Sequence, residues 1–189
     1  AALLTLLGWF LDAVTMTPAI HFLLRDTWAI REAQYIFYVD ASTSWGLGIW
    51  FPALQLALYS QTAVDSRYSG LTIYTLEMLA ILAALRFADT SLPPTGKRIL
   101  VWSESQNCVD AFHTLRSAPH NVPILQAVTL IELRIGCSLR ICHTRGKSRG
   151  DFVTHTKHFP KAIYRQIDPP PWPVTPDLNA TKNIHESLK

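Results

Sequence analysis

The stretch YVDASTSWGLGIW, residues 38–50, has the pattern of two β-strands joined by a short polar turn. One aspartate, Asp40, closes the first of these strands, which is otherwise aromatic and apolar. The two-residue period of a strand puts Asp40 on the same face as Ile36 and Tyr38. An acid in this place is typical of a turn, but also of a site that rigid strands position. The other acids of the chain bear on the choice between the two.

Length and composition indicate one folded domain with appendages. The chain has 189 residues, 49% of them hydrophobic, which is enough to build a core and excludes wholesale disorder. A formal net charge of +3 is compatible with a polyanionic partner without indicating one. The three cysteines, an odd number without CxxC spacing, indicate reduced thiols in an intracellular protein, cytoplasmic or nuclear, rather than disulfides or a zinc site.

The apolar start AALLTLLGWFLDAV is the one stretch that could be taken for a membrane or signal segment. Asp12 interrupts it, no basic region precedes it, and the run is shorter than the ~20 residues that a span needs. We therefore expect a buried helix or strand here and no membrane partner. The missing initial methionine is compatible with a fragment of a longer polyprotein.

The middle of the chain predicts an α/β fold with a mixed sheet. Strand patterns cover 35–40, 45–51, 56–62, a stretch starting at Lys97 (KRILVWSES) and SLRICHT from Ser138. Helical patterns cover LTIYTLEMLAILAALRFAD with Thr72 as its N-cap, 106–115, 122–135 and 148–158. The order βββαβααβα, with three strands in hairpin order and then αβ units, predicts five strands flanked by helices.

Three zones of different composition follow from this reading: an apolar N-terminal segment 1–33, the α/β domain 34–158 and a tail 159–189. Six of the twelve prolines lie between Pro160 and Pro176. Such a run interrupts helices and central strands, so we expect an extended or disordered tail. It is either a plain spacer or a ligand for the groove of a partner protein.

Four acids recur at the ends of elements or on a buried face: Asp40, Glu77, Glu104 and Asp151. Glu77 is flanked on its helix face by small and apolar side chains, so its carboxylate must be paired, protonated or bound to a cation. Oxygen ligands on rigid elements are what hard divalent cations require. Taken one at a time, the four are also explained as a turn former, two surface acids and a helix N-terminal charge. As a set they favour a metal site.

Four motifs in sequence, YVDASTSWGLGIW, LTIYTLE, ILVWSESQNCVDAF and HTRGKSRGDFVTH, resemble the ribonuclease H-like domain of retroelement reverse transcriptases, closest to the fungal retrotransposon type. RSAPHNVPILQAV resembles the stretch after the third motif, and the resemblance covers about residues 34–158. It implies a five-stranded mixed sheet flanked by helices. It also implies hydrolysis of the RNA strand of RNA–DNA hybrids with two magnesium ions, or manganese in their place, and no small-molecule cofactor. LLGWFLDAVTMT resembles a remnant of the reverse transcriptase segment after the palm.

Carried over by motif, Asp40, Glu77 and Asp151 match the catalytic, metal-binding acids of that family. Glu104 stands where the family has aspartate, and the last motif reads Ser148-Arg149-Gly150-Asp151 instead of Asn-x-Ala-Asp. The extra methylene of Glu104 displaces the carboxylate by more than the ~0.5 Å that a preorganised site tolerates. We therefore expect weakened or absent cleavage with residual metal binding. The alternative is a catalytically silent module that binds nucleic acid or protein, or a decayed fragment.

The resemblance also gives roles to residues near the last motif. His143 and His155 flank it, and a histidine there would assist proton transfer or product release; a plain surface role is the alternative. The basic residues Arg145, Lys147 and Arg149 would contact the phosphates of the hybrid. The same basic run also fits a solvated loop.

Overall fold

The computed structural model describes residues 2–16, 28–93, 98–144 and 162–172. Its strands are β1 (Tyr35–Ser42), β2 (Gly46–Phe51), β3 (Leu56–Ser60), β4 (Arg98–Ser103), β5 (Ser138–His143) and β6 (Ile163–Gln166). Its α-helices are α1 (Ala2–Met16), α2 (Ile73–Ser91), α3 (Gln106–Thr114) and α4 (Val122–Arg134). The predicted α/β class, the first five strands and the helices that correspond to α2, α3 and α4 are confirmed. The predicted helix 148–158 lies outside the described residues.

The strands form one mixed sheet in the order β5-β4-β1-β2-β3-β6. The first three strands are joined as antiparallel hairpins, and β4 and β5 run parallel to β1. Parallel strands end at the same edge of a sheet, so the carboxyl ends of β1, β4 and β5 lie side by side. This edge is where the sequence places Asp40, Glu104 and His143.

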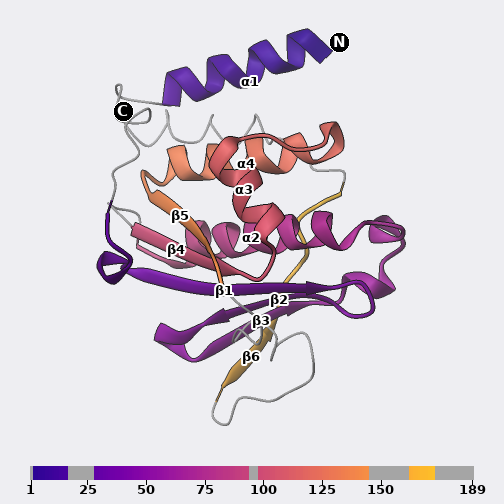
Figure 1. Cartoon of the computed structure of the whole chain (residues 1–189), viewed down its shortest axis with the longest axis vertical. Coiled ribbons are helices and arrows are strands. Elements are labelled where there is room, and N and C mark those ends of the chain that lie inside the picture. Colours follow the sequence, from indigo (N-terminus) through magenta and orange to yellow (C-terminus); the bar gives the residue numbers. More distant parts are fainter. Residues whose placement is uncertain (1, 17–27, 94–97, 145–161, 173–189) are drawn as a thin grey trace.

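The helices α2, α3 and α4 lie together on one side of the sheet, as Figure 1 shows. Helix α2 packs on β1, β2 and β4, and α4 packs on α2. The core between them is formed by fully buried apolar side chains, among which are Phe37, Phe51, Ile49, Leu79 and Ile99. The rings of Phe37 and Phe51 stack with centroids 4.7 Å apart. Because α2 is buried along most of its length, the position of Glu77 in its second turn is fixed by the core.

Local capping explains where two of these helices begin. The hydroxyl of Thr72 accepts a hydrogen bond from the backbone N–H of Thr75 and caps α2, as predicted. The hydroxyl of Ser105 accepts one from the N–H of Cys108 and caps α3. Both caps are therefore set by residues that directly precede the helices.

The hairpin of the opening stretch depends on a glycine at its turn. Gly46 has φ +146°, and a Cβ atom there would lie 2.0 Å from the backbone oxygen of Ser60. Only glycine allows β2 and β3 to approach so closely at this end. The polar turn therefore returns the chain so that Gly48 lies beside Asp40 in the sheet.

The prediction of five strands is wrong, because the sheet has a sixth. Strand β6 pairs in parallel with β3, from Leu56↔Ile163 to Tyr59↔Gln166. Its four residues are exposed and lie in the proline-rich tail. A strand so short and so close to prolines is tolerated only at a sheet edge, where one side of the backbone needs no partner. Neither its length nor its composition distinguishes it from a spacer.

Helix α1 is confirmed as regular structure, but its expected burial is not. It packs against α4, on the far side from the sheet (Figure 1). Large apolar side chains on it are exposed by half or more: Leu3, Leu4, Leu6, Leu7, Phe10 and Leu11. Across the residues described, no helix is both long and apolar enough to cross a membrane.

Candidate acidic site

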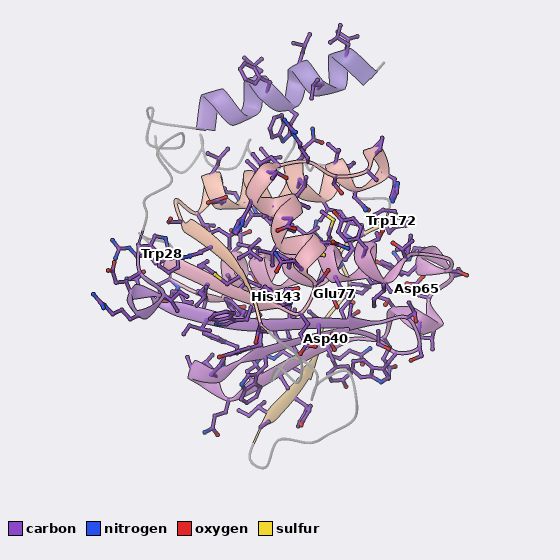
Figure 2. All side chains as sticks on the ribbon, viewed as in Figure 1. Trp28, Asp40, Asp65, Glu77, His143 and Trp172 are labelled. Carbon is purple, nitrogen blue, oxygen red and sulfur yellow. The ribbon has the colours of Figure 1, made fainter. Side chains whose placement is uncertain are left out.

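Parallel register brings two of the predicted acids to one edge of the sheet. Val39 of β1 pairs with Ser103 of β4, so Asp40 and Glu104 are the next residues along neighbouring strands. His143, the last residue of β5, pairs with Ser103 from the other side. Figure 2 labels Asp40 on β1, Glu77 on the helix above the sheet and His143 at the end of β5. Residues far apart in the sequence therefore meet at this edge.

Glu77 lies over this edge from α2 and is only 6% exposed. The backbone N–H of Ala41 and the carboxyl group of Asp40 both form hydrogen bonds with it. Its second oxygen, Oε2, is buried without a hydrogen-bond partner. A carboxylate oxygen in this state costs free energy unless a proton or a cation compensates it.

Burial, and then the negative charge of Asp40, raise the pKa of Glu77 from 4.5 to about 9. The charge of Glu104 raises it further, so this carboxylate also acts on Glu77. Asp40 is itself 6% exposed and Glu104 is half-buried. We call Asp40, Glu77 and Glu104 the acidic cluster. At neutral pH the carboxyl group of Glu77 is therefore protonated, unless a bound cation supplies the positive charge instead.

The backbone around Glu104 is held by hydrogen bonds on each side. The carbonyl oxygen of Ser103 accepts from the N–H of Thr144 (2.9 Å), and the Oγ of Ser103 accepts from the N–H of Ser105 (3.2 Å). The carbonyl oxygen of Glu104 is bonded to Nε2 of His143 (3.1 Å). Ser105 in turn caps α3. The turn that carries Glu104 is thus tied to β5 on one side and to α3 on the other.

A buried thiol lies next to the acidic cluster. Burial raises the pKa of Cys108 to about 12, and the charge of Glu77 contributes to the rise. Its Sγ donates to the carbonyl oxygen of Tyr74, 3.6 Å away. This thiol stays protonated and serves packing, as expected for a cysteine without an activating cation. All three cysteines are free thiols, in agreement with the sequence.

Several predicted site residues lie outside the described part of the chain. They are Asp151, the fourth acid, His155, and the basic residues Arg145, Lys147 and Arg149. Their proposed roles therefore stay predictions. The structure brings together Asp40, Glu77, Glu104 and His143.

The fit of a divalent cation rests on Glu77. Within residues 2–16, 28–93, 98–144 and 162–172, no three His, Cys, Asp or Glu side chains are grouped closely enough to hold a metal ion. The buried Oε2 of Glu77 nevertheless lacks a partner, and its pKa is raised by neighbouring carboxyls. A hard cation relieves both costs, and three carboxyl groups are the ligands it prefers. The residues present therefore fit a cation in donor type and charge.

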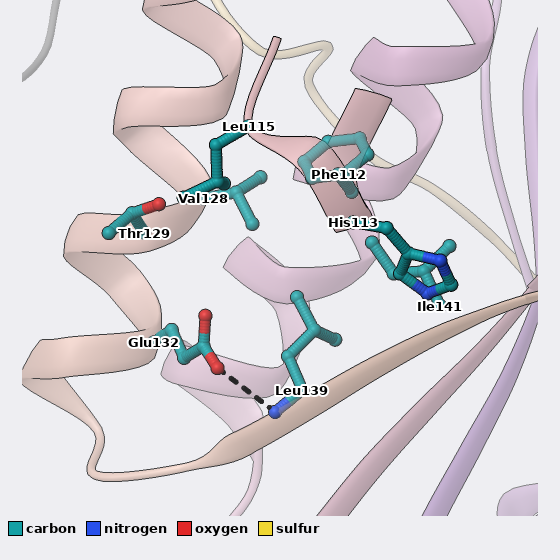
Figure 3. Close-up of a pocket in the computed structure, with 8 residues that line it drawn as sticks. All are labelled: Phe112, His113, Leu115, Val128, Thr129, Glu132, Leu139 and Ile141. Carbon is teal, nitrogen blue, oxygen red and sulfur yellow. Dashed lines mark hydrogen bonds between the residues drawn. The ribbon is translucent and has the colours of Figure 1, made fainter. Parts of the chain in front are cut away.

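Two cavities of the described fold are lined by residues outside the acidic cluster. One, drawn in Figure 3, lies between α3, α4 and β5; with about 20 Å³ it has room for one water molecule. In this cavity the carboxylate of Glu132 accepts a hydrogen bond from the backbone N–H of Leu139 (3.1 Å). This N–H belongs to the edge strand β5 and would otherwise lack that acceptor. A larger one of about 260 Å³ lies between α2 and α4, with Arg86 and Arg134 at its rim. Neither cavity adds a residue to the acidic cluster.

Sequence reasoning missed the residues that hold the acids in place. Ser103 and Ser105 hold the turn that carries Glu104, and the backbone N–H of Ala41 bonds to Glu77, yet none of the three carries a charge. The SES pattern between a strand and a helix was a usable signal, because serines there form caps and turns. The Ala41 contact had no signal in the sequence, since any residue but proline supplies a backbone N–H.

Comparison with known proteins gives no relative: no protein-family model matches the sequence, and no curated protein matches it.

Proposed function

We propose that this chain has a ribonuclease H-like fold and hydrolyses the RNA strand of RNA–DNA hybrids with the help of magnesium. The observation that carries the proposal is the buried carboxyl group of Glu77, which lies against Asp40 and close to Glu104. Stability alone does not favour two acids beside the buried, partnerless oxygen of a third. A cation-dependent reaction gives this arrangement a purpose.

Topology supports the finer fold assignment. Three antiparallel strands are followed by two strands parallel to the first, in the order β5-β4-β1-β2-β3. This is compatible with the five-stranded mixed sheet that the motif resemblance implies, with β6 added at the edge. The acids of the first three motifs, Asp40, Glu77 and Glu104, interact electrostatically with one another at Glu77, which supports the proposal.

In the proposed mechanism Asp40, Glu77 and Glu104, with Asp151 as the fourth acid, hold the metal. Magnesium bound there supplies an activated water and positive charge at the leaving oxygen of the phosphodiester. The chain itself contributes rigidity: Asp40 is fixed by paired strands, Glu104 by the hydrogen-bonded turn after β4, and Glu77 by a buried helix. Arg145, Lys147 and Arg149 are proposed to contact phosphates of the hybrid.

The test is cleavage of a hybrid with a labelled RNA strand, in magnesium and in manganese. We expect wild-type cleavage in at least one metal, and a loss of about 100-fold or more in Asp40→Asn, since this change removes a charge from the cluster. Asp110→Asn, an exposed acid on α3, is the matched control and keeps wild-type activity. Absence of wild-type cleavage in both metals, or an equally active Asp40→Asn, contradicts the proposal.

A second candidate is a catalytically silent module that binds hybrids without cutting them. The observation that favours it is the wide spacing of the described acids, none of which groups with two others closely enough to hold an ion. The extra methylene of Glu104 acts in the same direction. Tight hybrid binding that is unchanged by Asp40→Asn, without cleavage by either protein, would establish this module.

A further inference from the structure

We propose that His143 is a positioning residue that fixes Glu104 through its backbone carbonyl. The inference rests on the proposed function, since Glu104 matters only if the acidic cluster acts. It begins from the 3.1 Å contact between Nε2 of His143 and the carbonyl oxygen of Glu104.

The chemistry of this contact fixes which nitrogen carries the hydrogen. A carbonyl oxygen can only accept, so Nε2 must be protonated and donate. A neutral His143 is therefore the Nε2–H tautomer. Accepting a proton at Nε2 would require this hydrogen bond to break first. Nε2 of His143 is thus occupied by its hydrogen bond to the Glu104 carbonyl.

The surroundings of Glu104 show why such a bond is needed. Strand β4 ends at Ser103, and from there the chain leaves the sheet to enter α3 at Gln106. The carbonyl of Ser103 is held by the N–H of Thr144 and its side chain by the N–H of Ser105. The carbonyl oxygen of Glu104 is bonded to Nε2 of His143 (3.1 Å). Three hydrogen bonds, made by Thr144, Ser105 and His143, therefore hold the backbone on both sides of Glu104.

Fixing this backbone matters more for glutamate than for aspartate. Glutamate has one more rotatable bond, so its carboxylate samples more positions for a given backbone. Charge from Glu104 reaches Glu77, whose second oxygen is buried without a partner. A turn held by His143 keeps the Glu104 carboxylate within reach of the cluster. His143 thus acts on the site through Glu104.

Replacement by glutamine separates positioning from proton transfer. The amide of His143→Gln can donate to the Glu104 carbonyl much as Nε2–H does, but it cannot shuttle protons at neutral pH. We expect His143→Gln to keep hybrid cleavage within about threefold of wild type, and His143→Ala to lose about tenfold or more in kcat. His120→Ala, an exposed histidine before α4, is the matched control and leaves cleavage unchanged.

Two outcomes of this series overturn the proposal. If His143→Gln is as impaired as His143→Ala, the ring is needed for proton transfer; if His143→Ala is fully active, the bond has no role. Far-ultraviolet circular dichroism of each variant verifies that it is folded.

A second readout keeps this test separate from that of the nuclease. The ¹⁵N shifts of the His143 ring report the tautomer in the wild-type chain, and Mn²⁺ affinity reports the state of the cluster without any substrate. We expect the Nε2–H form, and Mn²⁺ binding weakened severalfold in His143→Ala but not in His143→Gln. A chain that cleaves no hybrid refutes the proposed function. The positioning role is then decided by these two signals: the Nδ1–H tautomer, or Mn²⁺ binding that the alanine leaves unchanged, overturns it.

Discussion

At the scale of single residues, the energetics of the site centre on Glu77. Its carboxyl is buried beside two other acids, so the neutral form is favoured in the absence of a cation. A folded-state pKa of about 9, above the ordinary 4.5, means that the folded chain binds the proton more tightly than the unfolded chain. The stability that this proton contributes is complete below about pH 4.5 and is lost as the pH rises toward 9.

Glu77→Gln should therefore stabilise the metal-free protein at pH 8 and change it little at pH 4.5. Each unit of pKa difference corresponds to ~1.36 kcal/mol, so we expect a gain of about 2 kcal/mol or more at pH 8 relative to pH 4.5. Urea unfolding in the presence of a chelator measures it. Glu32→Gln, at a surface ion pair with Arg98, is the control and changes little at either pH. A Glu77→Gln effect that does not vary with pH would refute the buried, raised pKa.

Glu104 is the residue that departs from the family pattern. Its carboxylate is one methylene further from the backbone than that of an aspartate at the same position. If this displaces it from the metal, Glu104→Asp should raise the rate of hybrid cleavage by about tenfold or more. Single-turnover cleavage with magnesium measures the rate, and Glu104→Gln, which keeps the length but removes the charge, should lower it. A slower Glu104→Asp variant would mean that the turn is adapted to glutamate.

At the scale of elements, β6 and the residues after it, 163–172, lie along the edge of the sheet; we call this segment the strap. The N–H of Ile167 donates to the carbonyl oxygen of Tyr59 (2.8 Å), and Trp172 packs against the main core. Between them, the hydroxyl of Tyr68 donates to the carbonyl oxygen of Pro170 at 2.5 Å in a buried contact. The strap therefore links the sheet to the segment that precedes α2.

Loss of this hydroxyl tests whether the strap contributes to stability. Tyr68→Phe leaves the buried Pro170 carbonyl without its donor, which should cost about 1–2 kcal/mol in the free energy of unfolding. Burial, the main cause, raises the pKa of Tyr68, so the hydroxyl stays protonated and able to donate at neutral pH. Urea unfolding measures the stability of Tyr68→Phe against that of a control, Tyr59→Phe. Tyr59 is a half-buried tyrosine on β3 whose ring lies beside Trp45. Equal stabilities of wild type and Tyr68→Phe would show that the strap is dispensable.

The opposite edge of the sheet is held in a different way. Trp28 is 4% exposed; its indole N–H donates to Ser138 of β5 (2.8 Å), and its carbonyl accepts from Arg140 (2.5 Å). The guanidinium of Arg140 also lies over the Trp28 ring, 5.9 Å from its centroid. The edge strand β5 is thus partly covered by Trp28, which limits pairing with other chains at this edge.

At the scale of the whole molecule, the sequence predicts the elements better than their surroundings. The run of aromatic and β-branched residues from Tyr35 and the long helical pattern around Glu77 predict β1 and α2 to within two residues. The meeting of Asp40 with Glu104 follows from parallel strand order, which the element sequence also predicts. Periodicity and order are local properties, and a single sequence carries them.

The features that the sequence does not predict depend on partners far along the chain. The four residues of β6 become a strand only because β3 has a free edge. Helix α1 exposes its leucines because it packs on α4 and not inside the core. The bond from His143 to the Glu104 carbonyl also joins residues far apart in the sequence. Hydrophobicity indicates that a residue can be buried, not which element will cover it.

A titration with Mn²⁺, followed by electron paramagnetic resonance at pH 7.5, tests most directly whether the acidic cluster holds a cation. We expect saturable binding by the wild-type chain, weakened about tenfold or more in Asp40→Asn because one of three clustered charges is lost. Asp110→Asn should bind as the wild type does. Absence of saturable binding, or equal affinity in wild type and Asp40→Asn, would contradict a cation site at Asp40, Glu77 and Glu104.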